Sequence, residues 1–347
     1  TGMDVVMLFQ RMIAQCESFT LLAVPLFVTA GVMMEYSGVA THMLNFADLF
    51  TGRMRGGLAQ VNVLLSTLMG GCSGSANADA AMEAKMLVPE MTKRGYDPAF
   101  SAGVTATSAC ITPIIPPGIT LILYATLAGV SVSDMFLAGY LPGALMCIIL
   151  MITVSILSRR KGYAPTRETR PTLKEFVSTT VKSVWALFIP LGLLMGLRVG
   201  MFTPTEGGAI VFVYCILVGF LVYRKLKLNM LPRVFIESLK TTSNIMFIIA
   251  GAAAFSYYLS WERIPQLVSS SILGLTDNKY VFLLIINVFL LICGMFLEGT
   301  ASTIILVPLL APVVQALGIN PIHFGILFAI NIQIGGTTPP FGTFMFT

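Results

Sequence analysis

Charged residues are scarce in this sequence, at 11% of 347 residues, where a soluble domain carries about 25%. This scarcity excludes an ordinary soluble globular protein. The two histidines, His42 and His323, are too few and too far apart for a metal cluster. No two of the six cysteines stand at CxxC spacing, so we expect them to be small apolar side chains in helices. The net charge of +5 is too small to predict a nucleic-acid partner.

Long apolar runs are abundant instead: hydrophobic residues make up 56% of the chain, with a mean hydropathy of +0.86. Runs near the roughly 20 residues that cross a bilayer recur along the chain. They include 19–34, 135–157, 184–197, 209–222 and 280–295. The sequence therefore predicts an all-α polytopic membrane protein in a lipid bilayer. The chain opens at Thr1 and stops at Thr347 inside an apolar run, so we expect a piece of a longer protein.

Basic residues gather in four places, which the positive-inside rule assigns to the cytoplasm. The clusters are Arg53 with Arg55, Lys93 with Arg94, six residues within 159–174, and four within 224–233. Two apolar stretches, 58–69 and 80–91, lie between the first two clusters, and each is too short to span. A re-entrant hairpin that enters and leaves on the cytoplasmic side satisfies both length and charge. Its expected tip is the small, polar run 70–77.

A helix broken by prolines is predicted directly after this hairpin. Residues 99–128 are long enough to span but are interrupted at 112–118, where Pro113, Pro116 and Pro117 occur. Spanning helices near 135–157, 180–199 and 206–223 follow, and 229–240 is an amphipathic stretch that we expect at the cytoplasmic interface.

The sequence contains an internal repeat with an offset of 223 residues. This offset places Gly95-Tyr96-Asp97-Pro98 on Gly318-Ile319-Asn320-Pro321, and Pro116-Pro117 on Pro339-Pro340. We expect a first repeat unit at 20–130, connecting helices and a cytoplasmic arm at 131–240, and a second unit at 241–347. Counting crossings from the basic loops puts the second hairpin on the opposite side of the membrane. The prediction is an inverted repeat with two re-entrant hairpins and two broken helices, as in secondary transporters.

The breaks are candidate ion sites because proline has no N–H to bond the carbonyl four residues before it. Pro116 and Pro117 should free the carbonyls of Thr112 and Pro113, and Pro339 and Pro340 those of Gly335 and Gly336. Unpaired carbonyls in hydrocarbon are costly, and a desolvated cation such as Na⁺ can bind them. Oxygens of the facing tips can complete each site: Ser73, Ser75 and Asn77 in the first copy, and Thr300 and Ser302 in the second.

Two acidic residues near the tips leave their roles open. Asp79 is a candidate for function or for capping the second helix of the first hairpin, and Glu298 for neutralising a cation, carrying a proton or pairing elsewhere. The N-terminal ends of helices that start after each tip and each break suit an anionic solute. Thr203-Pro204-Thr205-Glu206 predicts a helix cap.

Several motifs in order resemble those of the large membrane subunit of tripartite ATP-independent periplasmic (TRAP) transporters. They are Gly-Cys-Ser-Gly-Ser-Ala-Asn-Ala-Asp at 71–79, Pro-Glu-Met-Thr-Lys-Arg-Gly-Tyr-Asp-Pro at 89–98, Ile-Ile-Pro-Pro at 114–117, Leu-Ala-Gly-Tyr-Leu-Pro-Gly at 137–143 and Phe-Thr-Pro-Thr-Glu at 202–206. The resemblance covers essentially the whole chain.

This resemblance implies a Na⁺-driven elevator-type transporter in a bacterial inner membrane, with a small membrane subunit and a periplasmic binding protein as partners. The implied solutes are small organic acids such as C4-dicarboxylates, sialic acid and other sugar acids, and two or more Na⁺ ions are implied. The implied ion ligands are Ser73, Ser75, Asn77, Thr112 and Pro113 at one site and Gly299, Thr300, Gly335, Thr337 and Thr338 at the other. The solute would lie between them, against Ser75, Asn77, Pro116, Thr337 and Thr338.

Three other functions compete with this one. A dicarboxylate or citrate carrier without a binding protein shares the architecture, and a channel also uses re-entrant hairpins. Gly71-Cys72-Ser73-Gly74 resembles the nucleophile motif of an intramembrane serine protease, but that chemistry needs a base beside the serine. Neither histidine is expected near Ser73, so we expect no enzyme. The sequence does not name the solute.

Overall fold

The chain folds into helices joined by short loops, and the computed structural model describes residues 5–167, 169, 171–275 and 278–346. Only the backbone is described for Val5, 71–73, 269, 272–273 and 275. The first nine helices are α1 (Val5–Cys16), α2 (Ala23–Ser37), α3 (Val39–Thr51), α4 (Gly57–Ser73), α5 (Ala76–Lys93), α6 (Pro98–Ala109), α7 (Ile119–Ala128), α8 (Val132–Lys161) and α9 (Leu173–Val199). The later ones are α10 (Pro204–Leu217), η1 (Val218–Val222), η2 (Leu228–Met230), α11 (Leu231–Trp261), α12 (Ile264–Leu275), α13 (Lys279–Phe296), α14 (Gly299–Ala316), α15 (Pro321–Gly335) and η3 (Thr343–Met345).

Among the described residues, six helices are long and apolar enough to cross a membrane, or up to seven spans are present if α2 and α3, bent by 72°, form one. Their outer faces are apolar: Leu141 of α8 is 80% exposed, and Phe247 of α11 is 78% exposed. Apolar side chains in such numbers on the outside of a protein mark a surface that lipid covers. The predicted all-α membrane architecture is confirmed.

The two hairpins and two broken helices predicted from the sequence are present, and the offset of 223 residues relates their boundaries. Helix α5 (Ala76–Lys93) maps onto α14 (Gly299–Ala316) from first residue to last, and the start of α6 maps onto the start of α15. The helix caps repeat as well. Asp97 Oδ1 accepts from the Ala99 N–H at 3.1 Å, and its equivalent Asn320 accepts from the Ile322 N–H at 2.9 Å.

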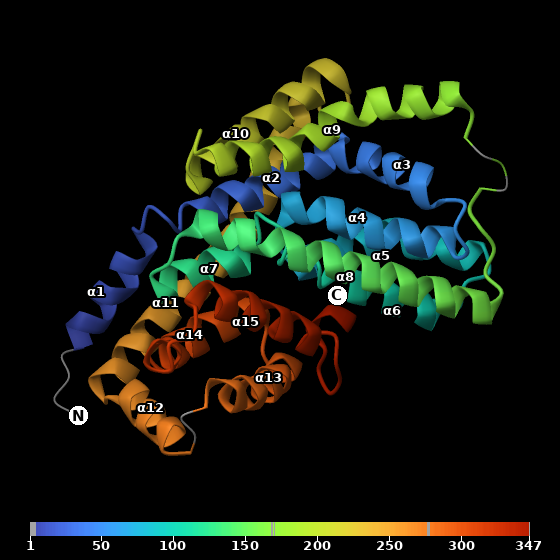
Figure 1. The fold of residues 1–347 in the computed structure, drawn as a ribbon. Helices are drawn as coiled ribbons and strands as arrows, with labels where there is room; N and C mark the ends of the chain where they lie inside the picture. Colours follow the sequence, from blue (N-terminus) through green and yellow to red (C-terminus); the bar gives the residue numbers. More distant parts are fainter. Residues whose placement is uncertain (1–4, 168, 170, 276–277, 347) are drawn as a thin grey trace.

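The hairpins point in opposite directions, as contacts at their open ends establish. The open end of the first hairpin adjoins the start of α6, where Asp97 accepts from Lys161 at 2.9 Å. The open end of the second hairpin adjoins the far end of the same broken helix, because Tyr124 of α7 donates to the Pro321 carbonyl at 2.7 Å. One hairpin therefore enters from each side, and the ribbon shows them opening toward opposite sides (Figure 1).

One contact locates the axis that relates the two repeats. The Cys110 thiol donates to the Gln333 carbonyl at 3.2 Å, and these residues are 223 positions apart. Equivalent residues can touch across a two-fold relation only beside its axis. The axis therefore passes next to the first helix break.

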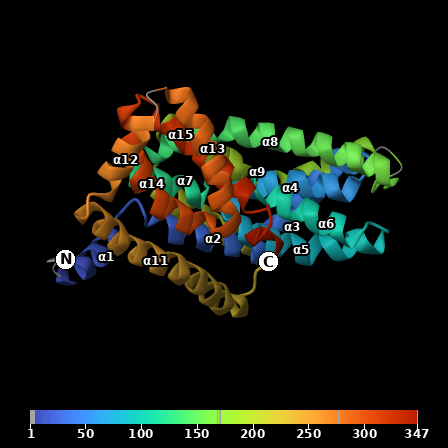
Figure 2. The ribbon, with the colours of Figure 1, turned by 90° about the horizontal axis from the view of Figure 1, so that it is seen from below.

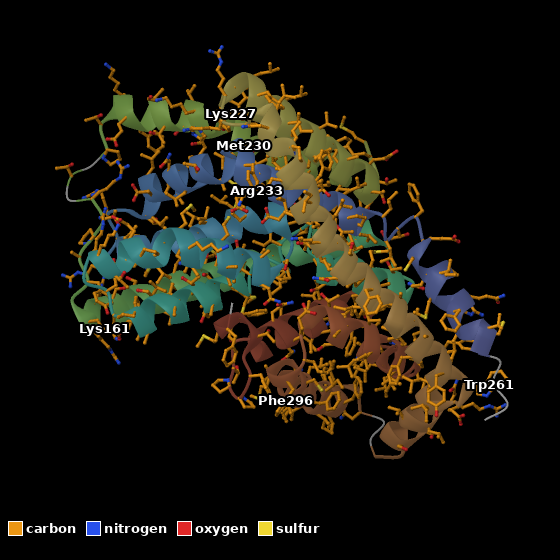
Figure 3. The ribbon with its side chains drawn as sticks, turned by 180° about the vertical axis from the view of Figure 1, so that it is seen from behind. Lys161, Lys227, Met230, Arg233, Trp261 and Phe296 are labelled. Atoms are coloured by element: carbon orange, nitrogen blue, oxygen red, sulfur yellow. The ribbon has the colours of Figure 1, made fainter. Side chains whose placement is uncertain are left out.

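The remaining helices form a second group beside the hairpins. Helix α2 packs against α10 and α11, α3 packs against α9, and α1 packs against α11. Figures 1 and 2 show α11 crossing the molecule obliquely beside both hairpins. The amphipathic stretch 229–240 is continuous with this helix, which Figure 3 follows from Met230 to Trp261. The expected boundary between 240 and 241 thus falls inside α11.

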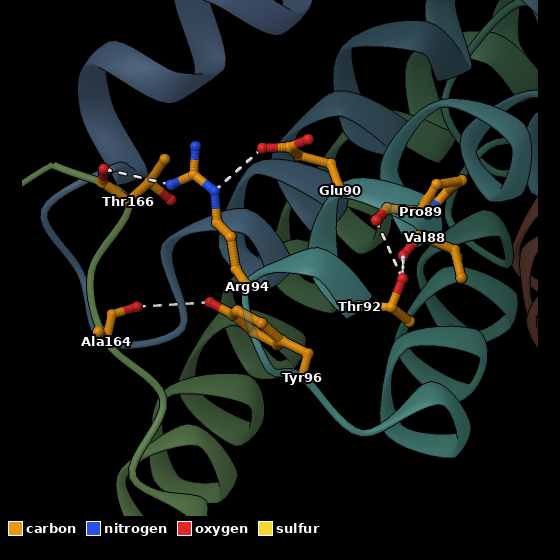
Figure 4. Close-up of polar contacts among 8 residues, drawn as sticks. All are labelled: Val88, Pro89, Glu90, Thr92, Arg94, Tyr96, Ala164 and Thr166. Carbon is orange, nitrogen blue, oxygen red and sulfur yellow. Dashed lines mark hydrogen bonds and ion pairs between the residues drawn. The ribbon is translucent and has the colours of Figure 1, made fainter.

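A loop on the predicted cytoplasmic side ties the two groups together. Arg94 donates to the Thr166 carbonyl and Tyr96 to the Ala164 carbonyl, both at 3.4 Å (Figure 4). Arg167 in the same loop pairs with Asp48 of α3 at 2.6 Å. The hydrogen bond from Lys161 holds the pKa of Asp97 below its ordinary value. The loop therefore contacts both the first hairpin unit and α3.

Candidate functional site

The tip of the first hairpin is a two-residue turn, Gly74-Ser75, that contacts the first helix break. Gly74 adopts the left-handed conformation (φ +59°), and a Cβ there would collide with the Pro117 carbonyl. Its carbonyl accepts from the Ile119 N–H at 3.1 Å. Ser75 is extended and caps α5 by accepting from the Ala78 N–H at 3.5 Å. The cap is thus Ser75, and the open question of an Asp79 cap is settled against it.

The first break, between Ala109 and Ile119, leaves backbone groups without helical partners. No backbone N–H in the described part of the chain bonds the carbonyl of Thr112 or of Pro113. The Thr112 hydroxyl donates to Asp79 Oδ2 at 2.7 Å, and both residues are fully buried. Ser73 ends α4, and its side chain lies outside the described part of the chain.

The second break differs from the prediction. The Gly335 carbonyl accepts from the Thr338 N–H at 2.8 Å, and the Gly336 carbonyl accepts from the Phe344 N–H at 3.2 Å. The expectation that both carbonyls lack a backbone donor is wrong. A turn that directly follows α15 supplies the Thr338 N–H, and the chain turns back at Gly342 (φ +53°) to supply the Phe344 N–H. The hydroxyls of Thr337 and Thr338 both donate to the Ile334 carbonyl, at 2.8 and 3.0 Å. Each of these two hydroxyl oxygens keeps a lone pair that can bind a cation.

Glu298 caps the second hairpin's inner helix. Its Oε2 accepts from the N–H groups of Thr300 and Ala301 at 2.8 and 3.3 Å, and its Oε1 accepts from the Thr300 hydroxyl at 3.0 Å. The N-terminus of α14 is therefore engaged by a carboxylate, and an anionic solute cannot use those amides. Helix α7 has no side-chain cap at Gly118, although its first N–H, from Ile119, bonds the Gly74 carbonyl, so the positive end of its dipole meets no carboxylate there.

Both tips and the first break meet in one cavity of about 470 Å³. Four predicted residues line it: Ser75, Asn77, Pro113 and Thr300. Apart from Ser73, the other predicted residues are absent from its lining: Thr112, Pro116, Gly299, Ser302, Gly335, Gly336, Thr337 and Thr338. Gly335 instead packs closely against Gly294, where a Cβ would lie 2.7 Å from the Gly294 Cα. Neither histidine lines the cavity.

Two of the oxygens at this cavity have no hydrogen-bond donor in the described part of the chain. Asn77 Oδ1 and Gln333 Oε1 are both buried without a partner, although the Gln333 amide nitrogen donates to Thr120 at 3.2 Å. Asp79 Oδ1 on α5 and Ser302 Oγ on α14 are also buried without a hydrogen-bond partner in the described part of the chain. Buried oxygens without donors are costly unless a ligand completes them. Amide, carboxylate and backbone oxygens fit a desolvated alkali cation.

Sequence reasoning missed Gln333, Phe344 and the α11 residues that line this cavity, Thr241 and Asn244. A signal was present for Gln333, which is one of few polar residues in the largely apolar helix α15 and is 2% exposed. No sequence signal marked Thr241 and Asn244, because their local pattern does not indicate that α11 crosses the hairpin tips. Phe344 reaches the cavity only through the turn after Pro340.

A polar network holds the first hairpin rigid behind its tip. Ser66 donates to Glu83 at 2.9 Å, Ser108 donates to Asn62 at 2.8 Å, and Asn62 donates to Thr105 at 2.7 Å. All five side chains are buried. Because the network joins α4, α5 and α6, these helices are expected to move as one body.

Comparison with known proteins finds a family model and several relatives that match nearly the whole chain. The profile of the family described as "Tripartite ATP-independent periplasmic transporter, DctM component" matches residues 1–347. The "C4-dicarboxylate TRAP transporter large permease protein DctM" of Pseudomonas aeruginosa is 39% identical over 330 residues, covering 95% of this chain and 77% of that protein. The "Sialic acid TRAP transporter large permease protein SiaM" of Vibrio cholerae is 36% identical, covering 96% and 78%.

A third relative is the "2,3-diketo-L-gulonate TRAP transporter large permease protein YiaN" of Escherichia coli, which is 38% identical, with 98% of this chain and 79% of that protein covered. Among solved structures, the YdaH transporter of Alcanivorax borkumensis, described as having an unusual topology, aligns with a TM-score of 0.64. That alignment covers 99% of this chain and 81% of the other at 15% identity. This likeness bears on the fold alone.

Proposed function

The chain belongs to the DctM component family of tripartite ATP-independent periplasmic transporters, and we propose that it imports a small organic acid by Na⁺-coupled alternating access. It is a multi-pass protein of the bacterial inner membrane. Its matched relatives are named as transporter permeases, which implies transport and not enzymatic turnover. As in the family, its partners are a small membrane subunit and a periplasmic binding protein that delivers the solute.

The observation that carries the sodium coupling is the pair of oxygens without donors, Asn77 Oδ1 and Gln333 Oε1, in the cavity where the tips meet. No lysine or arginine is among the described residues that line this cavity, and Glu298 adds a negative charge. An anionic solute therefore finds little positive charge there beyond the N-terminal end of α7. A bound Na⁺ supplies the positive charge that an anionic solute needs in this cavity. Solute binding then depends on the ion, which is the physical basis of coupling.

The solute class follows from the same charge argument. The named solutes of the three relatives, C4-dicarboxylate, sialic acid and 2,3-diketo-L-gulonate, all carry carboxylates. We extend this class to the present chain. The division into two helix groups supports an elevator movement, in which the hairpins and broken helices carry the cavity past α2 and α11.

The test is uptake into proteoliposomes that contain the chain with its small subunit, with the binding protein outside. We expect accumulation against a solute gradient only when the outside contains Na⁺. Uptake that is unchanged in choline chloride would remove the sodium assignment. Full-rate uptake of free solute without a binding protein would favour the related dicarboxylate or citrate carriers, and transport that never exceeds equilibration would favour a channel.

A further inference from the structure

A second cavity, of about 250 Å³, lies between the first hairpin and the scaffold helices α2 and α11. It shares Ser75, Ala78 and Thr241 with the cavity between the tips. The two cavities therefore adjoin at the cap of α5. The mechanism described so far gives the second cavity no role.

Its lining is rich in charge for a site among apolar helices. Glu35 of α2 and Glu237 of α11 face Lys85 of α5 across it, and their charges interact with one another. Tyr36 donates to Glu237 Oε2 at 2.8 Å, which fixes that carboxylate in place. Arg233, one turn earlier on α11, lies near Tyr36.

A fully buried carboxylate points into this cavity from the hairpin side. Asp79 is 0% exposed and lines the cavity, its Oδ2 accepts from Thr112, and its Oδ1 has no donor in the described part of the chain. The scaffold carboxylates therefore stand at one side of a polar cavity, and an oxygen that lacks a partner stands at the other. Such an oxygen fits a cation, because an ionised carboxylate that is buried this deeply needs a compensating positive charge.

The geometry points to a cation vestibule: Glu35 and Glu237 concentrate the coupling Na⁺ on its way between the cytoplasm and Asp79. Lys85 lowers the affinity of the vestibule, so that the ion does not stay there. This inference rests on the proposed sodium coupling and adds a route and its residues. The carboxylates repel an anionic solute, so the ion and the solute leave by different paths.

The vestibule opens on the predicted cytoplasmic side, because Glu237 lies near the start of α11, which adjoins the basic cluster at 224–233. Lys85 lies at the middle of α5, between the tip at Ser75 and the basic residues 93–94. Substitutions there should change the response to Na⁺ on that side only. In proteoliposomes with binding protein outside, the active molecules have their cytoplasmic face toward the lumen. Luminal Na⁺ inhibits uptake by slowing ion release. The luminal Na⁺ concentration that halves uptake therefore reports the affinity of the vestibule for Na⁺.

We expect Glu35→Gln and Glu237→Gln each to raise the half-inhibitory luminal Na⁺ by about three-fold, and Lys85→Gln to lower it by about three-fold. The external Na⁺ dependence should not change. Added choline chloride should shrink all three shifts because salt screens these charges. Glu90→Gln is the matched control. It removes one carboxylate charge from α5, the helix of Lys85, at a position outside the cavity where Glu90 pairs with Arg94 at 3.1 Å.

Unchanged luminal constants in the two glutamate variants, or equal shifts on both sides of the membrane, would overturn the vestibule. Shifts of the same sign in Lys85→Gln and Glu35→Gln would also overturn it, because a merely structural effect does not follow the sign of the charge. If wild-type uptake ignores Na⁺ on both sides, the failure belongs to the proposed function.

Discussion

At the scale of single residues, Asn77 is the sharpest test of the ion site. Its amide oxygen is buried without a donor in the described part of the chain, and the residue lines the cavity between the tips. Asn77→Ala removes this oxygen, and we expect the external Na⁺ concentration for half-maximal uptake to rise about ten-fold, the loss of one strong ligand. Uptake with Na⁺ titrated at saturating solute measures it.

The matched control for that substitution is Asn77→Asp, which keeps an oxygen of the same reach. It should retain sodium-dependent uptake with a smaller shift. An unchanged Na⁺ curve in Asn77→Ala would show that the oxygen faces no ion. Thr300→Ala should shift the curve less than Asn77→Ala, because the Thr300 hydroxyl is already engaged in donating to Glu298.

The sequence predicts some of these residues and not others for a physical reason. Ser75, Asn77 and Thr300 belong to polar interruptions of apolar helices, which a linear pattern reveals. The donor to the Gly336 carbonyl, the Phe344 N–H, comes from a turn that folds back onto the break, and the donor to the Gly335 carbonyl, the Thr338 N–H, comes from the turn directly after α15. Proline rules state which N–H is missing, but they do not state which N–H replaces it.

At the scale of elements, helix α8 holds the first break in place through glycines. A Cβ on Gly139 would collide with the Ile114 carbonyl and lie 3.1 Å from Leu121 Cδ1. We expect Gly139→Ala to displace the break, to destabilise the protein by about 1–3 kcal/mol as overpacking does, and to weaken Na⁺ binding. Thermal unfolding in detergent and the Na⁺ curve report these two effects.

Gly103→Ala is the control for this substitution, since a Cβ there meets nothing within 4 Å. It should leave the Na⁺ curve unchanged and leave stability unchanged or raised by up to about 1 kcal/mol, because alanine favours a helix more than glycine does. If both alanine variants behave alike, α8 does not position the break.

The order of the hairpins and broken helices was the most predictable level of this fold. Hairpin lengths and proline breaks are local properties of the chain, and comparison of the sequence with itself gives the offset of 223 residues, which carries α5 onto α14 without an end error. The expected unit boundary after 240, in contrast, falls inside α11. The crossing of α11 over the tips was not predictable, because a tilted helix and an upright one have the same composition.

At the scale of the whole molecule, the proposed elevator movement predicts that a covalent link between the hairpin and the scaffold stops transport. Val32 of α2 and Met82 of α5 both line the second cavity. With cysteines at both positions in a cysteine-free background, a cleavable bifunctional thiol reagent should abolish uptake, and cleavage of the reagent should restore it. Uptake assays before and after cleavage measure this.

The control pair for the cross-link lies within one body. Val63 of α4 and Val104 of α6 line a common groove, and a link between them should leave uptake largely intact. Full uptake by the protein cross-linked between α2 and α5 would show that these helices do not slide past each other.

The contact between Cys110 and Gln333 has a thermodynamic consequence. Under the proposed alternating access, repeat units that meet at a two-fold axis exchange conformations, and the exchange turns an inward-open molecule into an outward-open one. Identical units would make the two states equally populated. A thiol-bearing residue at one position and an amide-bearing one at its equivalent break this degeneracy, so the resting preference for one side of the membrane is written in the differences between the two halves.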